Sequence, residues 1–187
     1  VDIHFGEEWM ANVKAVLAGR TPDYLIVQHM EPDHSANISR FLEEYPQATV
    51  VATAKAFVMM KQFFGNDYAD RRIVASEMSE LSLGAHTLHF VMAPMVHWPE
   101  AMVTYDDVDK VLFSADGFGS FGALNGNVFA DEVDFDRDWL DDARRYYTNI
   151  VGKYGQPAQT ALKKLGGLPI QMICATHGPI RRSHIAD

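Results

Sequence analysis

In the first third of the chain, hydrophobic residues occur in two different patterns, at helical spacing and in short continuous runs. Residues 6–17 carry apolar side chains at helical spacing, and Gly19 follows them as a typical stop signal. Residues 23–27 form a short apolar run, which is typical of a buried strand. The elements expected in this region are helices at residues 6–17, 35–45 and 54–64 and strands at residues 23–27 and 49–52.

The middle of the chain changes to short strand-like segments at close intervals. A glycine-rich loop at residues 116–127 follows them. Helices that alternate with strands, before a run of strands, predict a layered α/β fold with functional groups on the loops at the strand ends. The sequence has no repeat or interdomain linker, so we expect a single domain at residues 1–187. The elements expected here are strands at residues 72–74, 81–83, 87–92, 102–105, 111–114 and 171–174 and helices at residues 136–154 and 158–165.

Composition narrows the classes of protein to which this chain can belong. Of its 187 residues, 48% are hydrophobic, and no apolar run approaches the ~20 residues that span a bilayer. The formal net charge is -9 and the basic residues form no stripe, which excludes nucleic acid as a partner. The single cysteine, Cys174, excludes an internal disulfide and a thiolate metal cluster, and it favours a cytoplasmic location. Any metal must therefore be bound by histidines and carboxylates.

Histidines and carboxylates gather in one short segment directly after the first expected strand. Residues 28–34 read Gln-His-Met-Glu-Pro-Asp-His, and they contain four potential ligands: His29, Glu31, Asp33 and His34. An extended backbone would put the first three on one side, because the side chains of a strand alternate. One loop could then present ligands to two metal ions. The alternative is an ordinary solvated loop, which the density of ligands makes the weaker interpretation.

Three further motifs follow later strands: His97-Trp98-Pro99, Ser114-Ala115-Asp116 and Thr176-His177-Gly178-Pro179. Together with the His-x-Glu-x-Asp-His segment, they make the chain resemble the flavodiiron protein family over residues 3–180. That resemblance implies a metallo-β-lactamase-type αββα sandwich. The opening strands of the family and its C-terminal flavodoxin-like domain are absent from this sequence, which suggests a fragment, so the flavin-binding residues are unknown.

The resemblance also implies how seven ligands are divided between two irons. One iron would be bound by His29, Glu31 and His97. The other would be bound by Asp33, His34 and His177. Asp116 would bridge the two, and we expect no catalytic residue beyond these ligands.

A single position separates this pattern from that of the zinc hydrolases with the same fold. Those enzymes typically have a histidine where this chain has Glu31, and a hard anionic oxygen favours iron or manganese over zinc. The resemblance then implies an oxidoreductase that reduces dioxygen to water, or nitric oxide to nitrous oxide, with electrons from flavin mononucleotide (FMN). It further implies rubredoxin or another flavin or iron protein as the electron donor, and a head-to-tail homodimer. The sequence does not choose between the two gases.

Two other functions remain open at this point. Without a flavin domain, the chain could be a sensor that binds dioxygen at two irons without turning it over. It could also be a dinuclear zinc hydrolase that uses metal-bound hydroxide as the nucleophile, although Glu31 argues against this. The sequence also leaves two roles for Trp98, which could form a wall of the pocket or pack in the core. In the family a tyrosine can reach the bound gas, and the sequence does not distinguish Tyr146 from Tyr147 in that role.

Overall fold

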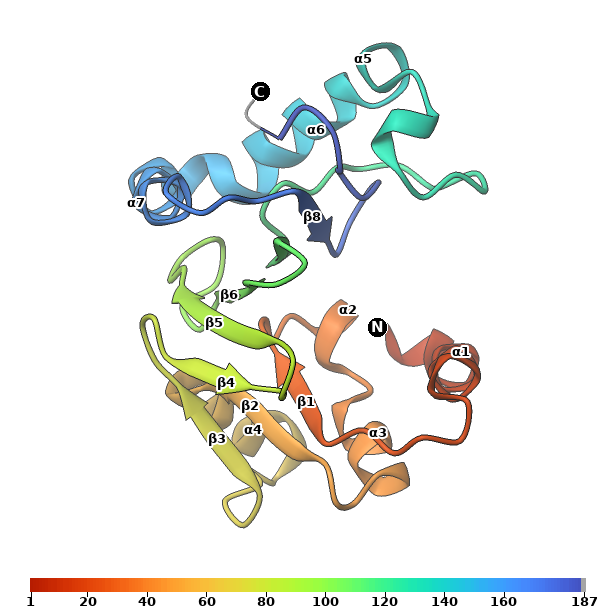
Figure 1. Cartoon of the computed structure of the whole chain (residues 1–187), viewed down its shortest axis with the longest axis vertical. Coiled ribbons are helices and arrows are strands. Elements are labelled where there is room, and N and C mark those ends of the chain that lie inside the picture. Colours follow the sequence, from red (N-terminus) through yellow and green to blue (C-terminus); the bar gives the residue numbers. More distant parts are fainter. Residues whose placement is uncertain (186–187) are drawn as a thin grey trace. The chain divides into compact units, whose positions relative to one another are not determined.

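The computed structural model describes residues 1–185, in which the chain forms two compact units (Figure 1). Unit 1 comprises Val1–Ala75 and unit 2 comprises Ser76–Asp187. Each unit has a β-sheet and helices of its own. No helix among the described residues is both long and apolar enough to cross a lipid bilayer.

Unit 1 is built on a three-stranded parallel sheet with the strand order β1-β2-β3. Parallel neighbours need a crossover connection, and helices α3(Ile38–Glu44) and α4(Ala54–Phe64) lie in the two crossovers. A buried cluster joins these helices to α1(Gly6–Leu17) and to strands β1 and β2, with Met10, Phe41 and Phe57 among its members. The strands are β1(Tyr24–Val27), β2(Thr49–Thr53) and β3(Arg72–Ala75).

The ends of the longer helices in unit 1 follow from local chemistry. A short 3₁₀ turn, η1(Ile3–Phe5), leads into α1, which ends at Ala18 in the left-handed conformation. Helix α4 starts after Thr53, whose hydroxyl accepts the amide of Ala56 at 3.2 Å. It ends at Gly65 with φ 73°, a conformation that costs glycine little because it has no Cβ.

The segment after β1 differs from the expected one. The sequence predicts an extended loop and then a helix at residues 35–45, but α2(Pro32–Ser35) begins earlier and α3 follows it as a separate helix. Pro32 occupies the first helical position, where its fixed φ favours the helix and its missing N–H is not needed. The Ser35 hydroxyl does not cap a helix but donates to the carbonyl oxygen of Met30 at 2.8 Å. The expectation of an extended backbone is therefore wrong at Asp33, the third of the ligands that it was to place on one side.

Unit 2 is built on a five-stranded mixed sheet with the strand order β4-β5-β6-β7-β8. Neighbours from β4 to β7 are antiparallel, whereas β8 pairs parallel with β7. Helix α7(Gly155–Leu165) packs on the sheet through Ala161 and Leu165, which share a buried cluster with Val103 and Leu112. The strands are β4(Glu80–Ser82), β5(Thr87–Met92), β6(Met102–Asp106), β7(Val111–Ala115) and β8(Met172–Ala175).

The helical region between β7 and β8 is more broken than the single helix predicted at residues 136–154. Trp139 leaves the helical conformation, with φ -128°, between two short helices. Its ring lies so close to Gly122 that a Cβ there would come within 2.9 Å of it. Helix α7 also begins three residues before the predicted position. The other elements here are η2(Ala130–Glu132), α5(Phe135–Asp138), α6(Leu140–Tyr146), the π-helical turn η3(Tyr147–Val151) and η4(Gly152–Tyr154).

Candidate metal centre

In unit 1, a loop leads from β1 into α2 (Figure 1). Its four candidate ligands form two pairs. His29 Nε2 lies 3.4 Å from Oε2 of Glu31. His34 Nε2 lies 3.4 Å from Oδ2 of Asp33. The two imidazole rings are 5.5 Å apart. Each pair therefore combines one imidazole with one carboxylate, and the two pairs are close neighbours.

This pairing comes from the change of backbone conformation within the loop. Glu31 is extended, with φ -56° and ψ 139°, and α2 begins at the next residue. Asp33 and His34 consequently lie in a helical turn, instead of continuing the alternation of a strand. Met30 is fully buried and accepts the hydroxyl hydrogen bond of Ser35, so the loop is held at its centre by the core.

In unit 2, the Asp116 carboxylate directly follows β7 and faces two histidines. Its Oδ2 lies 3.0 Å from Nε2 of His97, and its Oδ1 lies 3.5 Å from Nε2 of His177. Asp116 is 1% exposed, so bulk water does not compete for its oxygens. The structure thus brings all three candidate ligands of this unit together around one carboxylate.

Hydrogen bonds hold the loops of unit 2 that carry these ligands. The Ser114 hydroxyl donates to the carbonyl oxygen of Gly117 at 2.6 Å, which closes the turn around Asp116. The backbone amide of Ser120 donates to the carbonyl oxygen of His177 at 3.2 Å, which joins the two loops. A Cβ at Gly178 would come within 2.9 Å of the Ser120 side chain, so glycine permits this close approach.

Thr176 is a residue of this site that the sequence did not identify. Its hydroxyl donates to Oδ1 of Asp116 at 2.7 Å. The only signal in the sequence is its place directly before His177, and a threonine beside a ligand is too common to carry a prediction.

The structure distinguishes the two tyrosines that the sequence left open. Tyr146 is 3% exposed, and its ring lies 5.5 Å from that of His177 and 5.0 Å from that of Phe121. Tyr147 is 51% exposed. Tyr146 is therefore the tyrosine beside a candidate ligand. Trp98 lies edge-on to His97 at a ring distance of 6.3 Å, so it contributes to the surroundings of that ligand.

Two other histidines of unit 2 have carboxylate partners of their own. His86 Nδ1 lies 2.8 Å from Oδ2 of Asp106, and His89 Nε2 lies 3.2 Å from Oδ2 of Asp107. The hydrogen bond to Asp106 raises the pKa of His86. Burial opposes ionisation of Asp106, but the amide of Val108 and the contact with His86 outweigh it and lower the pKa of this carboxyl. Both histidines thus have carboxylate partners outside the set of seven candidate ligands.

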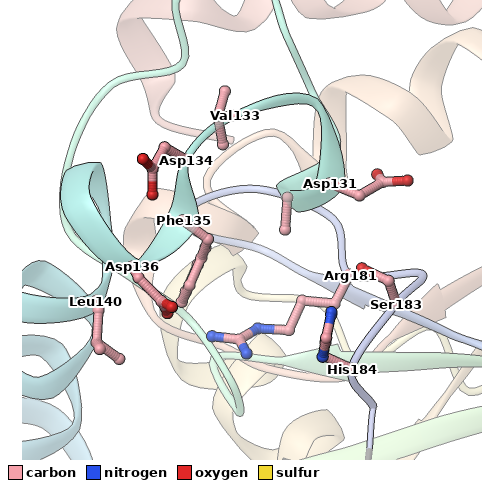
Figure 2. A pocket seen from close by; sticks show the side chains of 10 residues that line it. Asp131, Val133, Asp134, Phe135, Asp136, Leu140, Arg181, Ser183 and His184 are labelled. Atoms are coloured by element: carbon pink, nitrogen blue, oxygen red, sulfur yellow. The ribbon is translucent and has the colours of Figure 1, made fainter.

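A cavity in unit 2 has a volume of about 610 Å³ and is lined by none of the seven candidate ligands. Figure 2 shows the side chains that line it. Arg181 extends into it and lies over the ring of Phe135 at 4.4 Å. Burial lowers the pKa of this guanidinium. The cavity is lined by Ala130, Asp131, Val133, Asp134, Phe135, Asp136, Leu140, Arg181, Ser183 and His184.

Comparison with known protein sequences points to one family. A family model described as "ODP family beta lactamase" matches residues 3–178. A putative diflavin flavoprotein A 1 of Thermosynechococcus vestitus is 31% identical over 97% of this chain. An anaerobic nitric oxide reductase flavorubredoxin of Salmonella arizonae is 30% identical over 98% of this chain. The chain spans 31% and 38% of the lengths of these two relatives, respectively.

Solved structures agree with the sequence matches. The flavodiiron protein from Giardia intestinalis matches with a TM-score of 0.89 and 30% identity, over 98% of this chain and 44% of that one. The rubredoxin oxygen:oxidoreductase from Desulfovibrio gigas matches with a TM-score of 0.89 and 30% identity, over 97% and 45% of the two chains. The metallo-β-lactamase-like α/β fold predicted from the sequence is confirmed.

Proposed function

Because the chain belongs to the ODP family of metallo-β-lactamase-like domains, which flavodiiron proteins share, we propose that it is the diiron domain of an oxidoreductase that reduces dioxygen or nitric oxide. The observation that most supports this is the Asp116 carboxylate, whose two oxygens face two different histidines. A carboxylate that bridges two metal ions must present one oxygen to each of them. Asp116 is arranged in that way by unit 2 alone.

The distances between candidate ligand atoms fit metal ions. Bonds from a metal to imidazole nitrogen or carboxylate oxygen are about 2.0–2.2 Å long, so adjacent ligand atoms around one ion lie about 3 Å apart. The two contacts of Asp116 measure 3.0 and 3.5 Å. The two pairs in unit 1 each measure 3.4 Å. Four imidazole–carboxylate contacts of this length are compatible with two metal ions.

We therefore assign the seven side chains to two irons. His29, Glu31 and His97 would hold one iron, and Asp33, His34 and His177 would hold the other. Asp116 would serve both, since its Oδ2 faces His97 and its Oδ1 faces His177. The division is the one that the resemblance to flavodiiron proteins implies, and the pairs within unit 1 and the two directions of the Asp116 carboxylate are compatible with it.

The donor set favours iron over zinc. Glu31, Asp33 and Asp116 supply three negative charges that offset most of the charge of two divalent cations, and hard oxygen ligands favour iron or manganese. When bound, a diferrous pair supplies two electrons to a small molecule. The side chains of the chain itself would hold and orient the metals, while the buried ring of Tyr146 limits the access of water beside His177.

The names of the relatives suggest the substrates and the electron donor. One is called an anaerobic nitric oxide reductase flavorubredoxin and another a rubredoxin oxygen:oxidoreductase. Dioxygen or nitric oxide is accordingly the proposed substrate, with electrons arriving through FMN from rubredoxin or another flavin or iron protein. The head-to-tail dimer, the cytoplasmic location and the organisation of residues 1–187 as one domain stay predictions.

Iron quantitation with Mössbauer spectroscopy tests the ligand assignment. Asp116→Ala should cost both irons, because its carboxylate serves both, whereas His97→Ala should mainly weaken one. His86→Ala is the matched control, since His86 also contacts an aspartate but lies outside the proposed ligand set. It should retain both irons. Loss of the same single iron in Asp116→Ala and His97→Ala contradicts the bridge.

Gas consumption separates the reductase from the other two functions. With a reduced flavin or rubredoxin donor, the iron-loaded protein should consume dioxygen or nitric oxide over many turnovers. A stable dioxygen adduct without turnover would instead identify a sensor. Zinc content with ester hydrolysis and no gas uptake would identify a hydrolase, and either result would overturn the proposal.

A further inference from the structure

The Asp116 carboxylate has a hydroxyl partner on one of its two oxygens. Thr176 Oγ1 donates a hydrogen bond of 2.7 Å to Oδ1. This is a short contact for a hydroxyl and a carboxylate, as expected when the acceptor carries a charge. Oδ1 is also the oxygen that faces His177, whereas Oδ2 faces His97. The hydroxyl therefore acts on the oxygen assigned to only one of the two metals.

The backbone holds this hydroxyl in place. The amide of Thr176 donates to the carbonyl oxygen of Ala115 at 2.9 Å, one residue before Asp116. Ala115 and Ala175 are paired in the parallel ladder between β7 and β8. Thr176 and Asp116 are thus the first residues beyond a fixed pair, and their side chains meet because of that register.

We propose that Thr176 is a positioning residue that fixes the rotation of the Asp116 carboxylate and so strengthens the metal on the His177 side selectively. This inference rests on the proposed diiron function. Without the hydroxyl, the carboxylate can pivot about its remaining contact at Oδ2, and Oδ1 no longer points steadily toward the metal on the His177 side. Loss of an outer-shell partner of a metal ligand typically weakens metal affinity by about 10–100-fold. Oδ2 keeps its own contact with His97 at 3.0 Å, so the displacement is largest at Oδ1.

Stepwise iron binding to the metal-free protein tests this proposal. Fe²⁺ is titrated anaerobically into the wild type and four variants by calorimetry, and Mössbauer spectra of ⁵⁷Fe-loaded samples identify the two sites. His177→Ala defines which binding step belongs to the His177 side. Thr176→Val removes the hydroxyl but keeps the shape, and Thr176→Ser restores the donor. Thr148→Val is the matched control, because the hydroxyl of this exposed threonine bonds only to the helix carbonyl of Arg144 among the contacts of the described residues.

Thr176→Val should weaken the step that His177→Ala abolishes by about 10-fold and leave the other step within about 3-fold of the wild type. Thr176→Ser and Thr148→Val should both stay close to the wild type. Equal weakening of both steps, or no change in either, overturns the positioning role while the diiron assignment stands. A wild type that binds fewer than two irons overturns both proposals. Should the valine variant fail to fold, Thr176→Ala gives the same comparison with a smaller side chain.

Discussion

Gly119 should not tolerate even a methyl group, because it lies against a buried ring. A Cβ there would come within 2.7 and 2.8 Å of two Tyr146 ring atoms and 3.1 Å of the carbonyl oxygen of Asp116. The ring is 3% exposed and packs between Phe121 and His177, so it cannot simply swing away. Inserting a methyl group into a packed site costs about 1–3 kcal/mol. Gly119→Ala should therefore lower the free energy of unfolding by that amount.

Urea denaturation of the metal-free protein measures this cost. Gly155→Ala is the control, since a Cβ at this first residue of α7 meets nothing within 4 Å. It should be neutral or raise the free energy of unfolding by about 0.4–1 kcal/mol, because alanine restricts the unfolded chain more than glycine does. In a Tyr146→Leu background, which removes the ring, the Gly119→Ala cost should fall. A Gly119→Ala cost below about 0.5 kcal/mol, or an undiminished cost without the ring, refutes the reasoning.

Two further predictions concern parts of the fold outside the metal site. The pKa of His86 is raised above its ordinary value of 6.5, mainly by the hydrogen bond to Asp106. A raised folded-state pKa contributes stability that is fully present below pH 6.5 and is lost as the pH rises through the pKa of the folded protein. Over that pH range the free energy of unfolding should therefore fall less in His86→Gln than in the wild type. Urea denaturation over a pH series tests this, and a difference from the wild type that is constant with pH contradicts it. Thr53→Ala should cost about 1 kcal/mol through the lost cap on the Ala56 amide. The matched Thr160→Ala in α7 should cost less than about 0.5 kcal/mol, and equal costs would argue against the cap.

The sequence predicted the two long helices of unit 1 well because both of their signals are local. The helices expected at residues 6–17 and 54–64 are α1(Gly6–Leu17) and α4(Ala54–Phe64). Apolar spacing defines their length, and a left-handed residue ends each of them. Neither signal depends on contacts with distant parts of the chain.

The sequence does not predict the broken helices, because the contact at the break joins residues that are far apart in the chain. Trp139 interrupts the predicted helix at residues 136–154 where its ring packs against Gly122, seventeen positions earlier in the sequence. Helical spacing says nothing of such a contact. The start of α2, in contrast, has a local signal in the sequence, because a proline such as Pro32 is common in the first turn of a helix. This proline signal outweighs the extended backbone expected from the ligand pattern.

The candidate ligands could be identified from the sequence by residue type, but their arrangement in unit 2 depends on strand register. The β7–β8 ladder pairs Phe113 with Cys174 and then Ala115 with Ala175, so Ser114 is an extra residue. Without this bulge, Ser114 would pair with Ala175, and Asp116 would stand opposite His177 instead of Thr176. Bulges commonly redirect a side chain beside a functional site. The bulge brings the Thr176 hydroxyl beside the Asp116 carboxylate. The number and positions of histidines and carboxylates in the sequence do not predict this contact, because it depends on the register of two strands.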